Sequence, residues 1–240
     1  MPERIRIGML TPSSNTVLEP VSTALAAAMP EVSLHFARFR VVEISLRAAA
    51  LGQFDPEPML QGAELLADAH VDAVCWNGSS VAWLGLDADR RLCGEIVART
   101  GISANSAVLA LVELFRRVGV QRYGLVSPYT SDVQERIVAT FEAEGFACAA
   151  ERHVGERRNF HFADIAAARV EAMMDDVAAA RLQAIIVLCT NMDGATVAPA
   201  IEARYDIMVV DSIAAAMWGA LRTAGADPHR LSHAGRLFAL

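Results

Sequence analysis

The sequence predicts an α/β protein made of two similar halves, each a four-stranded parallel sheet flanked by helices, with a candidate site in the cleft between them. Three observations lead to this fold class. Short apolar runs rich in Val and Ile alternate with stretches of helical spacing along the chain. No low-complexity segment or long linker interrupts the alternation. Segments of the first half also reappear, in the same order, in the second.

The elements follow from the period of the apolar residues. The expected strands are 4–10, 32–39, 71–76, 102–104, 121–126, 147–153, 183–188 and 207–210. The expected helices, where apolar residues recur three or four positions apart, are 18–28, 57–69, 88–99, 106–117, 131–144, 162–180, 195–204 and 213–224. Because strands and helices alternate, we expect parallel sheets with helices on both faces.

Three pairs of segments carry the internal repeat. They match 7–17 with 123–133, 71–80 with 182–191, and 101–119 with 207–225. The first pair aligns Gly8 with Gly124, and the second aligns Gly78 with Cys189. Any two βα units look partly alike, but here the order and the glycine and proline positions agree together, which favours a duplication. We expect the halves to comprise 1–112 together with 213–240, and 113–212.

Composition limits the possible partners. Of the 240 residues, 54% are hydrophobic and 20% charged, which suffices for a sizeable core in one large or two smaller domains. The net charge of −7 argues against nucleic acid or an anionic membrane surface as the main partner. No apolar run is long enough to span a bilayer. The start "MPERIRIGML" enters a strand pattern without secretory features, so we expect a cytoplasmic protein. The sequence leaves open whether it is a monomer or a homo-oligomer.

The residue types also exclude several kinds of chemistry. All 21 basic residues are arginines, which excludes the P-loop lysine, a pyridoxal phosphate Schiff base and lysine-dependent aldol chemistry. No GxGxxG motif follows a strand, which argues against a dinucleotide. The four cysteines have no zinc-type spacing and are expected to be free thiols. We therefore expect no metal site, and none of the P-loop nucleotide, pyridoxal phosphate or dinucleotide sites.

Four polar loops follow strands of the two predicted sheets. Ligands of parallel α/β sheets bind outside the carboxyl ends of the strands, so these loops are expected to share one cleft. Their hydroxyl, amide and backbone N–H groups at helix starts suit a carboxylate or a phosphate. In a single loop such residues are more often helix N-caps, but four loops at one edge favour anion binding. The candidates are Pro12, Ser13, Ser14, Asn15, Gly78, Ser79, Ser80, Tyr129, Thr190 and Asn191.

Cys189 directly follows a buried strand in "AIIVLCTNMDGA". It is either a small apolar filler, as cysteine usually is, or a thiol with a depressed pKa beside a helix start, able to act as proton donor or nucleophile. Cys75 and Cys148 lie within strands and Cys93 on a helix, which favours packing.

The loop 155–161 contributes two further candidates. Asn159 is positioned to cap the site, and His161 comes near the cleft only if this loop folds over it. Trp83 follows a cleft loop and could line an apolar pocket, whereas Trp76 and Trp218 are expected in the core.

Four segments together resemble one enzyme superfamily. "TPSSNTVLEP", "SPYTSDVQERI", "VLCTNM" and "HAGRLF" resemble motifs of the aspartate/glutamate racemase superfamily, in the branch of maleate cis-trans isomerases and arylmalonate decarboxylases. The resemblance covers nearly the whole chain. It implies two α/β halves related by a pseudo-twofold axis, a substrate held between them, and no metal, nucleotide or other cofactor.

The resemblance also assigns roles to single residues. Racemases and isomerases of this superfamily carry one cysteine on each lip of the cleft; Cys189 matches the second, and Gly78 stands in place of the first. Arylmalonate decarboxylases share this arrangement, with small hydroxyl residues after the glycine, as in Ser79 here. Asn15 and Asn159, however, match asparagines of the isomerase carboxylate site. Cys75 would replace the missing thiol only in a different strand register.

The leading hypothesis is a cofactor-independent decarboxylase of a small, substituted malonate-type dicarboxylate. The loops would hold one carboxylate, hydroxyl donors would stabilise an enediolate, and Cys189 would protonate it on one face. The alternatives are a maleate isomerase or an Asp/Glu-type racemase, and a non-catalytic dicarboxylate-binding protein. We further expect that a cysteine introduced at Gly78 would face the other side of the substrate and allow racemization.

Overall fold

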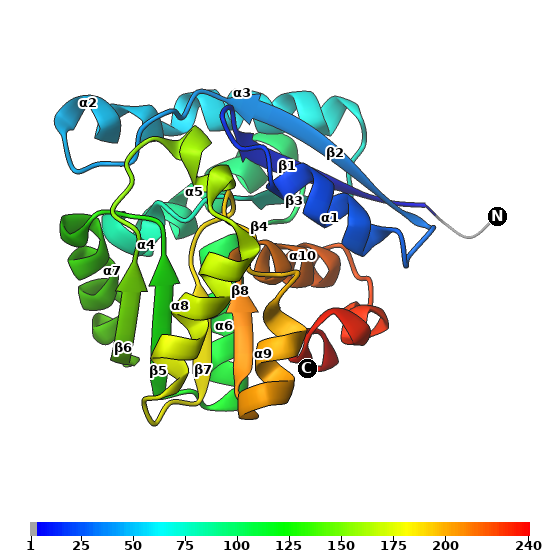
Figure 1. Ribbon diagram of the computed structural model, residues 1–240. Helices are drawn as coiled ribbons and strands as arrows, with labels where there is room; N and C mark the ends of the chain where they lie inside the picture. Colours follow the sequence, from blue (N-terminus) through cyan, green and yellow to red (C-terminus); the bar gives the residue numbers. More distant parts are fainter. Residues whose placement is uncertain (1–3) are drawn as a thin grey trace.

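Two four-stranded parallel sheets form the fold in the computed structural model, which describes residues 4–240 (Figure 1). The first sheet has the order β2-β1-β3-β4 and the second β6-β5-β7-β8, so the repeat extends to the topology. The strands are β1 (Ile5–Pro12), β2 (Val32–Phe39), β3 (Ala73–Trp76), β4 (Ala104–Ser106), β5 (Arg122–Ser127), β6 (Ala147–His153), β7 (Ala184–Val187) and β8 (Met208–Asp211). The fold class is confirmed, and each predicted strand overlaps an observed one, although the strand expected at 102–104 lies at 104–106. Residues 1–3 of the predicted N-terminal half lie outside the described residues.

Helices cover the sheets. They are α1 (Leu18–Ala26), α2 (Ala48–Leu51), α3 (Pro56–Asp68), α4 (Val81–Leu84), α5 (Asp87–Thr100), α6 (Ala107–Val118), α7 (Ser131–Ala143), α8 (Ala167–Ala178), α9 (Ala198–Tyr205) and α10 (Ser212–Thr223). Short 3₁₀ segments are η1 (Gly52–Phe54), η2 (Asn159–Asp164), η3 (Pro228–Ala234) and η4 (Arg236–Ala239). In the part of the chain that the structure describes, no helix is long and apolar enough to cross a membrane.

The predicted helices are all present, but two begin later than expected. The helix expected at 162–180 starts at Ala167, because the 3₁₀ segment η2 occupies Asn159–Asp164 before it. The helix expected at 195–204 starts at Ala198, since the Asp193 carboxylate accepts the Thr196 N–H at 3.1 Å and holds a turn there. The one-turn helices α2 and α4 were not predicted, because four residues are too few to show a period.

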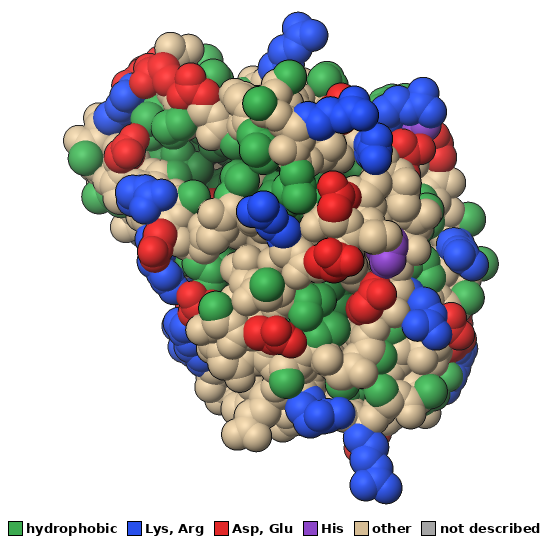
Figure 2. All heavy atoms as spheres, turned by 90° about the vertical axis from the view of Figure 1, so that its left-hand side faces the viewer, with side chains coloured by type: hydrophobic (Ala, Val, Ile, Leu, Met, Phe, Trp, Pro, Cys, Tyr) green, Lys and Arg blue, Asp and Glu red, His purple; other side chains and the backbone are tan. Residues whose placement is uncertain are grey.

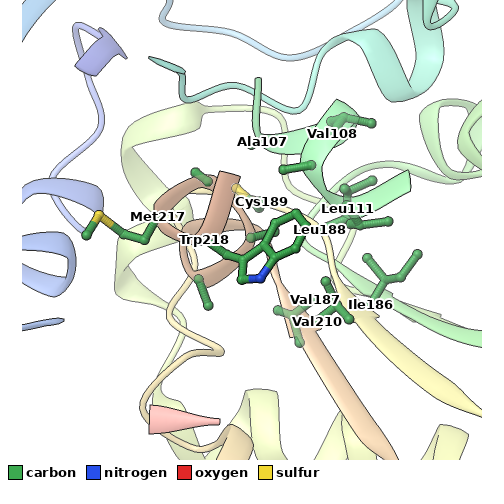
Figure 3. Close-up of a cluster of buried hydrophobic side chains, with 14 of the residues drawn as sticks. Ala107, Val108, Leu111, Ile186, Val187, Leu188, Cys189, Val210, Met217 and Trp218 are labelled. Carbon is green, nitrogen blue, oxygen red and sulfur yellow. The ribbon is translucent and has the colours of Figure 1, made fainter. Parts of the chain in front are cut away.

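The last helix of each half packs against the other half. In Figure 3 residues of α6, which follows the first sheet, lie beside residues of β7 and β8 in the second sheet. In return α10, which follows the second sheet, contacts β3 and β4 of the first and packs along α6. Trp218 of α10 lies at this junction with no exposed surface. One apolar core therefore runs through both halves. The division at 112/113 and 212/213 stays a prediction.

Replacing Trp218 with alanine should therefore weaken the whole molecule. Removing a fully buried tryptophan leaves a cavity between the exchanged helices, and we expect a loss of about 3–5 kcal/mol in the free energy of unfolding. Denaturant unfolding would measure this loss, with Leu65→Ala as control, because the Leu65 side chain is 68% exposed. Two separate transitions in the variant, or a loss no larger than that of the control, would contradict a shared core.

Candidate active site

A small cavity lies where the loops after β1, β3, β5 and β7 meet, at the carboxyl ends of these strands. Its volume is about 20 Å³, which is on the scale of one water molecule. The predicted site residues that line it are Pro12, Gly78, Ser79, Ser80, Tyr129, Asn159, Cys189 and Thr190. The rest of the wall is apolar and consists of Val41, Ile44, Phe54, Trp76 and Trp83. The duplication therefore brings both lips of the cleft together as expected.

Cys189 is the cysteine at this cavity, and it is 2% exposed. Its Sγ accepts the backbone N–H of Asn191 at 3.3 Å. Burial raises the pKa of the thiol to about 12, against the opposing effects of the Tyr129 hydroxyl and the Asn191 N–H. Of the two alternatives for Cys189, a thiol with a depressed pKa is not what this packing gives, because desolvation outweighs the donors around the sulfur. Near neutral pH Cys189 is a thiol, suited to giving a proton.

Tyr129 connects the two lips of the cavity. Its hydroxyl and that of Ser79 are 2.6 Å apart, within a hydrogen bond that joins the second half to the first. Burial raises the pKa of Tyr129 well above its ordinary value, so the phenol stays protonated. The ring is held edge-on against Trp83 and Phe162, with centroids 5.1 and 5.5 Å away. Ser79 and Tyr129 together therefore supply preorganised O–H groups in an otherwise apolar space.

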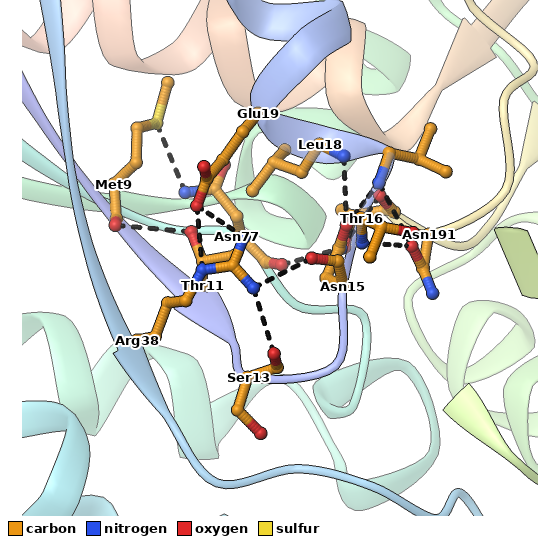
Figure 4. A network of polar contacts seen from close by, with 12 residues as sticks. Met9, Thr11, Ser13, Asn15, Thr16, Leu18, Glu19, Arg38, Asn77 and Asn191 are labelled. Carbon is orange, nitrogen blue, oxygen red and sulfur yellow. Dashed lines mark hydrogen bonds and ion pairs between the residues drawn. The ribbon is translucent and has the colours of Figure 1, made fainter. Parts of the chain in front are cut away.

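Asn15 and Asn191 lie behind the cavity wall, where their amides join the halves (Figure 4). Asn15 Nδ2 donates to the carbonyl oxygen and to Oγ1 of Thr190, at 2.9 and 3.1 Å. Its Oδ1 accepts the N–H of Leu18 at 2.9 Å and so caps α1. Asn191 Oδ1 accepts the N–H of Thr16 at 2.8 Å. Both amides are thus already bonded within the protein, and direct contact with a substrate stays a prediction.

Ser13 and Ser14 do not line the cavity, but both bond to the backbone of Val41, which does. Ser14 Oγ donates to the Val41 carbonyl at 2.6 Å and accepts from Asn159 Nδ2 at 2.8 Å. Ser13 Oγ accepts the Val41 N–H at 3.2 Å. Ser14 therefore links Asn159, which lines the cavity, to the first half.

Two loops from opposite halves pair over the cavity. Residues 42–44 and 157–159 form a short antiparallel bridge, in which the Ile44 N–H donates to the Arg157 carbonyl at 2.7 Å and the Asn159 N–H to the Val42 carbonyl at 3.0 Å. Loop 155–161 does fold over the site, but His161 faces Glu156, with 3.5 Å between the two side chains, and does not line the cavity.

The other cysteines lie elsewhere. Cys75 belongs to β3, and its side chain is buried against α10, with Sγ 3.7 Å from the Ala216 carbonyl. Burial raises the pKa of this thiol strongly. Cys93 is buried on α5, and Cys148 is half-buried on β6. None of the three lines the cavity, so the strand register does not bring Cys75 into the place of a second thiol.

Several residues that shape the site were not predicted. Val41 and Ile44 lie on the loop after β2 and Phe54 ends η1, where the only signal was an unusual run of apolar residues. Asp211, at the end of β8, accepts the Ile213 N–H at 2.7 Å and the Gly194 N–H at 3.2 Å, so it caps α10 and anchors the loop after Cys189. An acidic residue between a strand and a helix is the signal that could have identified this cap.

Wider depressions lie away from the strand ends. A groove of about 820 Å³ runs between α5 and α7 and is lined by charged side chains such as Arg90 and Glu144. It contains none of the twelve predicted site residues. Figure 2 shows a hollowed face of the molecule, with hydrophobic side chains in the hollow and arginine and acidic side chains around it. Residues 4–240 contain no group of three or more His, Cys, Asp or Glu side chains that could hold a metal ion.

Comparison with known proteins agrees with this geometry. The family model described as arylmalonate decarboxylase matches residues 20–238. The maleate isomerase of Nocardia farcinica (strain IFM 10152) is 27% identical over 241 residues, covering 97% of this chain and 94% of that protein. The arylmalonate decarboxylase of Bordetella bronchiseptica is 29% identical over 146 residues, covering 58% of this chain and 59% of that protein.

Solved structures share the fold. The Nocardia farcinica maleate cis-trans isomerase, as a mutant with one cysteine changed to serine and with a covalently bound succinylcysteine intermediate, superposes with a TM-score of 0.88 at 26% identity, covering 98% of each chain. A crystal structure of arylmalonate decarboxylase superposes with a TM-score of 0.77 at 23% identity, covering 98% of this chain and 99% of that one. The chain therefore belongs to the arylmalonate decarboxylase family, in the branch of the racemase-like superfamily that also contains the maleate isomerases.

Proposed function

We propose that this protein is a cofactor-independent decarboxylase of a small, substituted malonate, in which Cys189 protonates an enediolate on one face. The observation that carries the proposal is the asymmetry of the cavity, with a neutral thiol on one lip and Gly78 on the other. Inversion at carbon by two bases needs an acid–base group on each side, whereas decarboxylation needs one proton donor.

The cavity wall suits the loss of carbon dioxide. Val41, Ile44 and Phe54 withhold hydrogen bonds from the carboxylate that leaves, which favours its conversion to uncharged CO₂. As the carbon–carbon bond breaks, its electron pair passes into the remaining carboxylate and forms an enediolate. The Ser79 and Tyr129 hydroxyls donate to the developing charge. The Cys189 thiol then gives its proton to the α-carbon, and solvent reprotonates the thiolate.

Substrate entry requires the cover to open. A cavity of about 20 Å³ is too small for a malonate, so the bridge between 42–44 and 157–159 has to part before binding. We propose that Ser14 and Asn159, whose side chains bond each other at 2.8 Å, exchange this contact for a substrate carboxylate. Closure over the bound substrate would then exclude water from the enediolate.

A second candidate is cis-trans isomerization of maleate. Its support is the Nocardia farcinica relative, which matches over 97% of this chain. In this reaction a thiolate adds to one carbon of the double bond and an acid protonates the other. The succinyl adduct rotates about its central bond, and removal of that proton with loss of the thiolate gives fumarate. The solved relative is a cysteine-to-serine mutant that still carries a succinylcysteine, so that protein has two cysteines to consider. Here Cys189 alone lines the cavity, and its raised pKa disfavours a thiolate.

A direct assay separates these functions. Purified protein would be incubated in D₂O with methylmalonate, 2-methyl-2-phenylmalonate or maleate and followed by proton NMR. We expect a malonate to be consumed, its product to carry one deuterium from solvent at the α-carbon, and no fumarate to form. Conversion of maleate to fumarate without malonate turnover would replace our proposal with the isomerase. Tight dicarboxylate binding that survives loss of the thiol, without turnover, would indicate a binding protein.

Cys189 should be the one cysteine that turnover requires. In Cys189→Ser the proton donor is a far weaker acid, and we expect kcat to fall at least about 100-fold, within the usual range for a lost general acid. Cys75→Ser is the matched control, because Cys75 is buried but does not line the cavity, and its kcat should stay within about threefold. An inactive Cys75 variant beside an active Cys189 variant would refute the assignment of the donor.

The raised pKa of Cys189 predicts how its reactivity depends on pH. A group whose pKa is raised to about 12 stays protonated through the neutral range and loses its proton only near that value. Alkylation of Cys189 by iodoacetamide should therefore rise about tenfold per pH unit up to pH ~9.5, because the thiolate fraction stays small throughout. Peptide mass spectrometry measures this rate site by site. A plateau below pH ~9 would reveal a depressed pKa and favour a nucleophilic thiolate.

A further inference from the structure

We propose that Trp76 decides the stereochemical outcome, because its indole occupies the space that any side chain at position 78 would need and so keeps a second acid–base group off the face opposite Cys189. The stereochemical part of this proposal rests on the function proposed above. The steric part stands on the packing of the first half alone.

The contact between Gly78 and the Trp76 ring is the central observation. A Cβ added to Gly78 would lie 1.9 Å from Cζ2 of Trp76, 2.3 Å from Cη2 and 2.6 Å from Cε2. Real Cβ atoms essentially never come this close to another heavy atom. The φ angle of Gly78 is not in the positive range, so the backbone itself would accept an L-residue. The indole, and not the conformation of the loop, is what requires glycine here.

The ring is held firmly in this place. Trp76 is the last residue of β3, where it pairs with Leu10 of β1 and Ser106 of β4, and it is 1% exposed. Its ring packs against Phe39, with centroids 5.1 Å apart and planes at 51°. The buried Asp89 carboxyl lies close enough for the Trp76 side chain to affect its ionisation. Strand pairing and an aromatic contact therefore hold the indole in one position.

Trp76 also separates two spaces. The ring lines the cavity that contains Cys189 and also an adjoining cavity of about 220 Å³, and Phe54 and Ser80 are shared by both walls. This second space is where the indole could move if something displaced it. The expectation that a cysteine at Gly78 would by itself face the substrate therefore needs correction, because that thiol would first have to displace Trp76.

The chemistry that Trp76 prevents can be written in full. With thiols at positions 78 and 189, one sulfur as thiolate would remove the α-proton of a product acid. The C–H electron pair would enter the carboxylate to give the enediolate, and an S–H bond would form. The opposite thiol would then donate its proton to the other face of the α-carbon and become the thiolate. The acid would be inverted, and the two sulfurs would have exchanged roles.

The steric claim is tested by stability and needs no activity. We expect Gly78→Ala to lower the Tm by about 5 °C or more in the wild-type background and by less than about 2 °C in Trp76→Leu, because the smaller side chain leaves room for the methyl group. Gly94→Ala is the control, since a Cβ there meets nothing within 4 Å, and its effect should be equal in both backgrounds. Equal losses for Gly78→Ala in both backgrounds would overturn the claim.

The stereochemical claim is tested in D₂O with one enantiomer of 2-phenylpropionate. Wild type, Gly78→Cys, Trp76→Leu and the double variant would be compared by deuterium content and chiral chromatography. We expect the double variant alone to lose optical purity as deuterium enters, at least tenfold faster than either single variant. Racemization by Gly78→Cys alone at the same rate would mean that the indole moves aside, and retained configuration in the double variant would mean that position 78 does not face the substrate; either overturns the proposal.

The two failures remain distinguishable. If wild type decarboxylates no malonate, the proposed function fails, while the stability comparison still decides whether Trp76 keeps position 78 empty. If wild type is an active decarboxylase but the double variant exchanges deuterium without racemization, the function stands and the role of Trp76 in the stereochemical outcome is refuted.

Discussion

The two halves are held at one relative position by a short series of buried hydrogen bonds, and the site depends on them. Thr190 accepts from the Asn15 amide at 3.1 Å and donates to the Asn77 carbonyl at 2.9 Å, so a residue of the second half is bonded between two loops of the first. Asn191 adds a bond to the backbone of Thr16. A buried amide with no partner is costly, so these bonds favour one arrangement of the halves.

This arrangement places Cys189 in a small, largely apolar space. The same burial that raises the thiol pKa to about 12 also strengthens the hydrogen bond between Ser79 and Tyr129, because both lie away from water. A neutral thiol and a pair of hydroxyl groups are thus brought together at the carboxyl ends of strands from different halves. The chain brings them together by duplication, whereas a single sheet would offer only one lip.

The repeat and the strand periods were sufficient to predict both sheets, their parallel pairing and seven of the residues that line the cavity, while Asn159 was proposed from loop 155–161. They could not show that Asn15 and Asn191 are already bonded, because an asparagine before a helix looks the same as a cap or as a ligand. The direction of the Cys189 pKa shift also depends on desolvation, which only the closed packing of both halves reveals. One-turn helices such as α4 exist through tertiary contacts and leave no period in the sequence.

The residue type at Gly78 is restricted by a neighbouring buried side chain and not by its own backbone angles. A glycine at a strand end is usually explained by a turn or by the approach of a ligand, but here the backbone angles are ordinary and a buried indole fills the space of the missing side chain. The residue opposite Cys189 is therefore set by Trp76, two positions earlier on β3. On the proposed function, a change of packing inside one half of this chain would be enough to change how many acid–base groups face the substrate. The choice between one-face protonation and inversion would then be made by the core as much as by the loops.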